Sequence, residues 1–316
     1  MINQIKRLAA FQNPEFYKKQ NLRLSTALTP RVISCAEDFG KHINLPRGCL
    51  NDVQMLLEEN GSFLESEDLR HTGNPIETRF LGQLTDGQRQ AAEVILEHEN
   101  GVIVAPPGFG KTVLGTFLIA QRKCSTLILV HRQPLLEQWR SQIGIFLGQD
   151  AKAIGQVGGG KRKLTGQIDV AMIQSLSRKD SVDNIVAEYG QVIIDECHHL
   201  PAVSFERVLS EVKARYVVGL TATPQRRDGH QPIIHMQIGP VRFNVDPRSQ
   251  LAQRPFDHRL VARVTGFDPA AHASDTTIQQ LYGQLVVDEK RNDQIINDVL
   301  LAMEEGRSPI LLTERK

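Results

Sequence analysis

The chain has 316 residues, 41% of them hydrophobic, which is enough for ordinary folded cores and for more than one domain. Its formal net charge of +1 excludes a global positive field, so any binding of nucleic acid must use local patches of charge. The four cysteines have no C-x-x-C spacing, which argues against a disulfide framework or a structural zinc site, and no apolar stretch suits a signal peptide or a membrane span, so we expect a cytoplasmic protein with no membrane partner.

The first 80 residues are expected to form a small α/β accessory domain. The run Arg31–Phe39 predicts a strand, and apolar residues at helical spacing over Leu50–Leu57 predict a helix that Asn60-Gly61 would end. Two further short strands are expected over Phe63–Leu69 and Ile76–Leu81.

Residues 81–250 show strands alternating with helices. Five short segments, apolar on both faces, predict the strands of a buried parallel sheet: Gly101–Ala105, Thr126–Val130, Ile168–Ile173, Gln191–Ile194 and Tyr216–Leu220. Helical segments are predicted between them at Lys111–Arg122, Pro134–Phe146 and Val203–Glu211. The pattern predicts a doubly wound α/β domain, whose ligands bind at the carboxyl ends of the strands.

Residues 251–316 are less regular. A long helix is predicted around Val287–Met303, followed by a short apolar strand at Ile310–Leu312. We interpret this part as a linker and the start of a further α/β domain.

The string APPGFGKT at Ala105–Thr112 fits a phosphate-binding loop if Ala105 replaces the usual leading glycine. The loop leaves a predicted strand and enters a predicted helix, where backbone N–H groups and the helix N-terminus favour an anion. Lys111 would bridge the β- and γ-phosphates of a nucleotide, and the Thr112 hydroxyl would bind Mg²⁺. The nucleotide-binding residues expected in the loop are Pro107, Gly108, Phe109, Gly110, Lys111 and Thr112.

Two acids follow the fourth predicted strand. Asp195 would hold Mg²⁺, and Glu196 would orient and deprotonate the attacking water; a solvated acidic turn is the plainer alternative. Zinc at Cys197, His198 and His199 is disfavoured, because adjacent residues on a turn cannot all face one ion.

The tetrapeptide TATP follows the fifth strand. Thr221 and Thr223 can hydrogen-bond the segment that contains His198, as well as a neighbouring domain, and could thus couple nucleotide state to motion. Taken alone, the tetrapeptide is an ordinary turn, and its order after the other two motifs gives it meaning.

Further polar residues are candidates for base or phosphate contacts. Gln88 could present its amide to adenine or could simply face solvent, and the glycine turn within Gly158–Lys163 could bind a phosphate or form a solvated hairpin tip. The nucleic-acid candidates are Arg132, Lys161, Arg162, Gln174, Ser175 and Arg226.

In these residues the chain resembles superfamily 2 helicases and translocases of the DEAD/DEAH class. The matching positions are Gln88, Gly108–Thr112 for motif I, Leu129–Trp139, Met172–Leu176, Asp195–His198 for the DExH box and Thr221–Thr223 for motif III. The N-terminal unit loosely resembles the damage-recognition-like module of repair and restriction relatives. The resemblance implies a RecA-like fold, ATP and Mg²⁺ as cofactors, and DNA as the partner, with RNA as an alternative.

The chain departs from such motors in one respect, because the motifs of the second RecA-like domain do not follow. The resemblance therefore implies ATP–Mg²⁺ binding with poor hydrolysis by this chain alone, either as a fragment or as a subunit completed by a separate polypeptide. A nucleotide-gated DNA clamp that does not translocate is the alternative. A small-molecule P-loop kinase fits poorly, since the loop and the acids are far apart and TATP follows.

Overall fold

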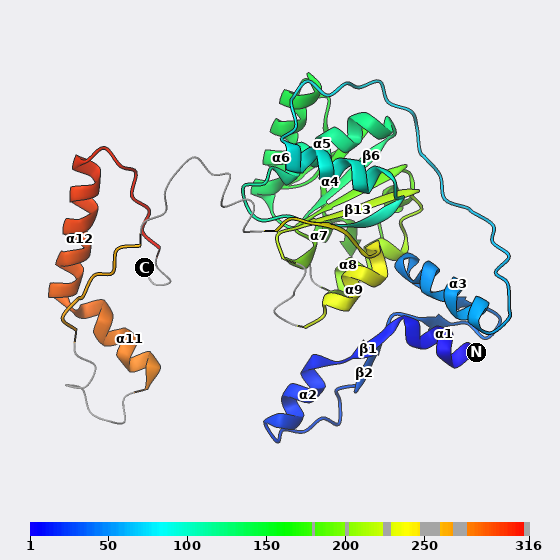
Figure 1. Ribbon diagram of the computed structural model, residues 1–316, viewed down its shortest axis with the longest axis horizontal. Helices are drawn as coiled ribbons and strands as arrows, with labels where there is room; N and C mark the ends of the chain where they lie inside the picture. The colour runs from blue at the N-terminus through cyan, green and yellow to red at the C-terminus, as the bar shows by residue number, and fades with distance from the viewer. Residues whose placement is uncertain (179–180, 200–201, 224–228, 247–259, 268–276, 313–316) are drawn as a thin grey trace. The chain divides into compact units, whose positions relative to one another are not determined.

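The computed structural model describes residues 1–178, 181–199, 202–223, 229–246, 260–267 and 277–312. They fall into two compact units, Met1–Gln253 and Arg254–Lys316 (Figure 1). The domain boundaries expected after residues 80 and 250 stay predictions.

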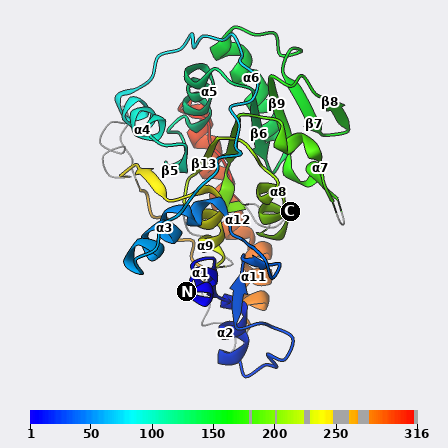
Figure 2. The same ribbon diagram turned by 90° about the vertical axis from the view of Figure 1, so that its right-hand side faces the viewer.

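The first unit is built on a sheet of eight strands in the order β14-β5-β13-β12-β6-β9-β7-β8. Every neighbouring pair is parallel except β7 and β8, which form an antiparallel hairpin at the edge seen in Figure 2. This architecture confirms the predicted doubly wound α/β fold. The strands are β5 (Asn100–Val104), β6 (Thr126–Val130), β7 (Gly155–Gly158), β8 (Lys161–Lys163), β9 (Ile168–Met172), β12 (Gln191–Asp195), β13 (Tyr216–Thr221) and β14 (Val241–Asn244).

Helices cover both faces of the sheet. Successive strand residues point to opposite sides, so these apolar strands present two apolar faces that both have to be covered. Ile103 and Ile128 pack with α4 (Asp86–Leu96), α5 (Lys111–Arg122) and α6 (Gln133–Leu147). Val102 and Leu127 pack with the other face, formed by α7 (Ile173–Leu176), α8 (Ala202–Ser210) and α9 (Gln231–Ile238). The helices predicted between the strands agree with α5, α6 and α8 to within one residue at each end.

The N-terminal segment is a small α/β arrangement, as expected. It contains α1 (Ile2–Leu8), β1 (Ala10–Gln12), α2 (Pro14–Asn21), β2 (Val32–Ser34), β3 (Glu37–Asp38), β4 (Ile43–Asn44), the 3₁₀ turn η1 (Arg47–Cys49) and α3 (Leu50–Glu59). β1 pairs with β2 and β3 with β4, each antiparallel. The predicted strand over Arg31–Phe39 is therefore two short strands, and the predicted helix ends near Gly61, where φ is +69°.

The η1 turn packs the N-terminal segment against the residues that follow α8 and against the C-terminal part of α9. The Arg47 guanidinium donates to the carbonyl oxygens of Val212 and Ala214, at 2.5 and 2.8 Å. Gly48 lies so close to α9 that an added Cβ would stand 2.1 Å from the His235 carbonyl oxygen. The contact therefore depends on glycine at this position.

The strands predicted at Phe63–Leu69 and Ile76–Leu81 are wrong. Neither segment joins a ladder, and the isolated bridges at His71 and Pro75 lie between the two segments. The Leu81 N–H instead donates to the carbonyl oxygen of Phe146, in the last turn of α6, at 2.8 Å.

The second unit contains α11 (Ile278–Val287) and α12 (Glu289–Glu304). The prediction over Val287–Met303 corresponds to α12, and the preceding helix α11 was not predicted. The strand expected at Ile310–Leu312 does not form, because this unit's described residues contain no strand with which it could pair. Across the described residues of the whole chain, no helix has the length and apolar character to span a membrane.

Candidate active site

The three motifs meet at the carboxyl edge of three adjacent strands. β13 lies between β5 and β12, with Thr221 opposite Val104 and Asp195 opposite Leu220. The Ala105 N–H donates to the Thr221 carbonyl at 2.8 Å, so the phosphate-loop string and the TATP string are joined directly. This edge is where an open parallel sheet binds its ligands.

The loop Ala105–Gly110 has the backbone that its glycines predict. Gly108 and Gly110 have φ of +83° and +84°, in the left-handed region that favours glycine. At Gly110 an added Cβ would also stand 2.4 Å from Gln88 Nε2. Since Gly110 is the N-cap of α5 and offers no side chain, no side-chain cap covers the first N–H groups of the helix. The loop therefore presents donors suited to an anion.

Lys111 holds the first two motifs together. Its Nζ lies 3.2 Å from the Ala105 carbonyl oxygen and 3.2 Å from Glu196 Oε1. The two side chains are largely buried, with 10% and 21% of their surfaces exposed. The ion pair brings the lysine of the loop and the second acid of DECHH into one site.

Asp195 is held by Trp139, a residue of α6. Its side chain is fully buried, and its Nε1–H donates to Asp195 Oδ2 at 2.8 Å. Oδ1 accepts the Glu196 N–H at 3.0 Å. Burial raises the pKa of Asp195 above its usual value, while the Trp139 bond opposes this rise. No local sequence signal could have linked two residues so far apart in the chain.

Glu196 has a strained backbone and an unsatisfied oxygen. Its φ is +49°, uncommon for a residue with a side chain and typical of functional sites. Oε2 is buried 3.3 Å from His198 Nδ1, yet it accepts no hydrogen bond from any residue that the structure describes. With Oε1 on Lys111, the second oxygen can accept a hydrogen bond from a bound water or substrate group.

A short network joins DECHH to TATP. The Thr221 hydroxyl donates to the Thr223 carbonyl at 2.7 Å, and His198 Nδ1 lies 2.6 Å from the same hydroxyl. Because a hydroxyl has one proton to donate, His198 Nδ1–H must be the donor to Thr221. Cys197 beside them is buried, which raises the pKa of its thiol to about 12 and makes it a poor metal ligand.

The oxygens at this edge fit Mg²⁺. Thr112 and Asp195 are both buried at the start of α5 and the end of β12, and hydroxyl and carboxylate oxygens are the ligands Mg²⁺ prefers. Within the described part of the chain, no group of three or more His, Cys, Asp or Glu side chains could hold a metal. A site with few protein ligands suits Mg²⁺, which takes most of its ligands from phosphates and water.

Gln88 is engaged by the protein itself. Its Oε1 accepts the Thr85 N–H at 3.0 Å and its Nε2 donates to the Phe109 carbonyl at 2.7 Å. The first bond belongs to a capping box at the start of α4, which the Thr85-x-x-Gln88 spacing could have revealed. The adenine contact stays a prediction, and the observed role of Gln88 is to support the phosphate loop.

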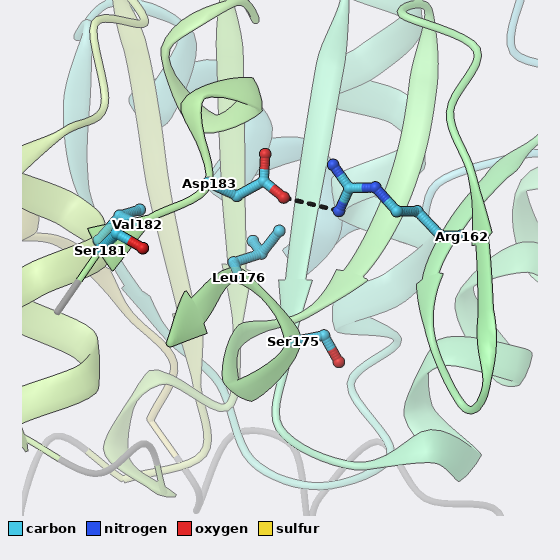
Figure 3. A pocket seen from close by; sticks show the side chains of 6 residues that line it. All are labelled: Arg162, Ser175, Leu176, Ser181, Val182 and Asp183. Atoms are coloured by element: carbon cyan, nitrogen blue, oxygen red, sulfur yellow. Dashed lines mark ion pairs between the residues drawn. The ribbon is translucent and has the colours of Figure 1, made fainter. Parts of the chain in front are cut away.

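Five of the six nucleic-acid candidates lie in the described residues, and Arg226 lies outside them. Arg132 is exposed at the N-cap of α6, and Gln174 Nε2 donates to the neighbouring His131 carbonyl at 2.7 Å. Lys161 and Arg162 form part of the β7–β8 hairpin, whose predicted glycine turn is present. Arg162 pairs with Asp183 at 2.6 Å beside Ser175 (Figure 3).

Comparison with known proteins finds chains that are similar to this one. Residues 81–226 match the family model described as "Type III restriction enzyme, res subunit". The chain is 32% identical over 161 residues to the DNA 3'-5' translocase XPB2 of Sulfurisphaera tokodaii, covering 51% of this chain and 35% of that protein. It is also 32% identical over 168 residues to the DNA 3'-5' helicase XPB of Mycobacterium tuberculosis, covering 51% and 30%.

A solved structure shows the same fold. The UvsW helicase from bacteriophage T4 aligns with a TM-score of 0.58 at 13% sequence identity, covering 76% of this chain and 92% of that one. The aligned part of the present chain spans about a third of the length of the two XPB relatives. The chain is therefore related to the superfamily 2 helicases, in the group that includes repair and restriction proteins.

Proposed function

We propose that this chain is the N-terminal part of an ATP-dependent DNA helicase or translocase and that it carries the ATP–Mg²⁺ site. The observation that supports this most is the contact of Lys111, Glu196, His198 and Thr221 at one edge of the sheet, which links all three motifs. The names of the XPB relatives favour DNA over RNA as the partner.

The residues at this edge divide the work of phosphoryl transfer. The backbone of Pro107–Gly110 and the N-terminus of α5 receive the phosphates, and Lys111 exchanges Glu196 for the β- and γ-phosphates. Thr112 and Asp195 hold the metal, which when bound neutralises charge on the phosphoryl oxygens. Glu196 then orients the attacking water and accepts its proton.

His198, Thr221 and Thr223 couple this site to motion. A change in the position of Glu196 reaches Thr223 through its contact with His198 and then through two hydrogen bonds, between His198 and Thr221 and between Thr221 and Thr223. We propose that a second motor domain, on this or another polypeptide, completes the site with an arginine, since such a residue raises hydrolysis by several orders of magnitude. This chain by itself should then hydrolyse ATP slowly.

Nucleotide titration of two variants tests the proposal. Lys111→Ala should weaken ATP–Mg²⁺ binding by at least about tenfold, because the main cation facing the phosphates is lost. Glu196→Gln should keep binding and lose whatever turnover the wild type shows. Lys152→Ala, which removes an exposed lysine outside the site, is the matched control. Unchanged ATP–Mg²⁺ binding in Lys111→Ala together with unchanged ATP turnover in Glu196→Gln would contradict the proposal.

Measurements of DNA affinity and of DNA-stimulated ATP hydrolysis separate a motor from a clamp. A clamp would change its DNA affinity with a non-hydrolysable ATP analogue yet show no DNA-stimulated hydrolysis when a second motor domain is supplied. Stimulated hydrolysis favours the motor.

A further inference from the structure

A small pocket of about 320 Å³ lies beside the β7–β8 hairpin, away from the nucleotide edge. In Figure 3 the Arg162 side chain points toward Asp183 from β8 on one side and Asp183 points toward it from the other, with Ser175 of α7 in the lower part of the view. The lining is completed by Leu176, Ser181 and Val182, of which the last two belong to β11 (Ser181–Val182). Side chains from β8, from α7 and from the segment Ser181–Asp183 therefore meet around one guanidinium.

The chemistry of this lining suits an anion with several oxygens. Arg162 keeps its charge, since its bond to Asp183 raises the pKa of the guanidinium. Its side chain is 48% exposed, so a ligand can reach it from solvent. The hydroxyls of Ser175 and Ser181 add neutral donors, and a guanidinium with nearby hydroxyls is a common phosphate-binding set.

The pocket is continuous with the surface that carries the other nucleic-acid candidates. An added Cβ on Gly159 of the hairpin turn would stand 3.1 Å from the Gln133 side chain, which follows Arg132. The Gln174 amide, next to Ser175, donates to the His131 carbonyl on the other side of Arg132. A strand lying across Arg132 thus has the pocket as its neighbour.

Asp183 is fixed in place independently of Arg162. Its side chain accepts the Ile185 N–H at 3.3 Å and so caps the following 3₁₀ turn, and its own N–H donates to the Leu176 carbonyl at 2.9 Å. The carboxylate therefore stays at the pocket when the long Arg162 side chain turns to another partner.

We propose that this pocket binds one backbone phosphate of a nucleic-acid strand through Arg162, and that Asp183 is a built-in competitor that lowers the affinity. The proposal rests on the proposed function only in taking nucleic acid as the partner. Binding exchanges the Arg162–Asp183 ion pair for an Arg162–phosphate pair, and the carboxylate left behind repels the strand. Removing the Asp183 charge should thus strengthen binding, whereas a purely structural ion pair predicts no gain.

The test measures the anisotropy of labelled single-stranded and duplex DNA with the full chain, without nucleotide, over a series of salt concentrations. Arg162→Gln should weaken binding about fivefold to tenfold and reduce the salt slope by about one. Asp183→Asn should tighten binding about threefold to tenfold at low salt and steepen the slope. Asparagine can still cap the 3₁₀ turn that follows, so the urea concentration at the midpoint of unfolding should not change.

Lys163→Gln is the matched control. It removes one charge from the same strand, but Lys163 alternates to the opposite face from Arg162 and its Nζ donates to the Lys152 carbonyl at 2.9 Å. We expect a change of about twofold or less from the general loss of charge. An equal loss in Lys163→Gln and Arg162→Gln, or an Asp183→Asn variant that binds DNA no more tightly than wild type, overturns the proposal.

Two further arms keep the conclusions separate. If inorganic tripolyphosphate binds as tightly as DNA and shows the same response to Asp183→Asn, the pocket is a free-anion site and the strand assignment is wrong. ATP titration of Lys111→Ala tests the proposed nucleotide site without reference to this pocket. If Lys111→Ala leaves ATP binding unchanged while Asp183→Asn tightens DNA binding, the proposed function is contradicted and the proposal for the pocket is supported. If the wild-type protein binds no DNA, the proposal for the pocket is contradicted.

Discussion

The hydrogen bond from Trp139 to Asp195 should be needed both for stability and for the metal site. Trp139→Phe keeps most of the buried ring but removes the only side-chain donor that the described residues give Asp195 Oδ2. A hydrogen bond to a charged group contributes about 1.5–3 kcal/mol, and the smaller ring leaves a void that adds about 1 kcal/mol. We therefore expect a loss of about 2–4 kcal/mol in the free energy of unfolding.

The pH dependence of this loss has a defined sign. Burial raises the pKa of Asp195 in the folded protein above its usual value of 3.8, so the folded state binds the proton more tightly than the unfolded chain. The stability from this group is complete below pH 3.8 and is lost as pH rises through the folded pKa. Without Trp139 the folded pKa rises further, so the variant loses more stability at neutral pH than in acid.

Urea unfolding at several pH values measures the stability, and Mg²⁺-dependent binding of a fluorescent ATP analogue measures the site. Phe205→Leu is the control, since Phe205 is equally buried but packs in the cluster on the opposite face of the sheet. It should lose stability without changing the Mg²⁺ dependence. If Trp139→Phe unfolds within about 0.5 kcal/mol of wild type and binds the analogue with unchanged Mg²⁺ dependence, the reasoning is refuted.

Three further substitutions test other parts of the structure. Gln88→Ala removes the cap on Thr85 and the bond to the Phe109 carbonyl, so it should lower stability by about 1–2 kcal/mol and weaken analogue binding; equal binding would contradict a supporting role for Gln88. Gly48→Ala forces a Cβ against a backbone carbonyl and should lower the free energy of unfolding by about 2–3 kcal/mol in urea, whereas Gly40→Ala, with open space around its Cβ, should change it less. Thr221→Val should keep analogue binding but abolish any effect of the analogue on DNA affinity, and an unchanged effect would exclude this hydroxyl from coupling.

The sheet could be predicted because its signals are local. Runs such as Thr126–Val130 are short, β-branched and apolar on both faces, and the glycines of the phosphate loop mark φ values that only glycine adopts readily. Phe63–Leu69 has three apolar residues beside three acids and forms no strand, because it lacks the continuous apolar run of a buried parallel strand. The strands that the sequence predicts correctly are inner strands of the sheet, each of which has a neighbouring strand on both sides.

The partners of the site residues could not be predicted in the same way. The motif order places Lys111, Asp195 and Thr221 at one edge, but nothing in the order indicates that Trp139 donates to Asp195 or that Asp183 pairs with Arg162. Both contacts join segments brought together only by the finished sheet. Residue type gave a weak hint for the indole, since a buried Trp N–H usually finds an acceptor.

The two cations proposed to bind phosphate share one property. Lys111 is paired with Glu196 and Arg162 with Asp183, so each faces a carboxylate in the unliganded protein. Phosphate binding at either site is then an exchange of ion pairs, and its net free energy is smaller than that of a cation meeting a phosphate alone. The consequences differ: Glu196 is freed to act on water, whereas Asp183 remains fixed by its backbone cap and repels the strand. Replacing the acid by its amide should therefore have a different effect at each site. Asp183→Asn should strengthen DNA binding, whereas Glu196→Gln should remove ATP turnover.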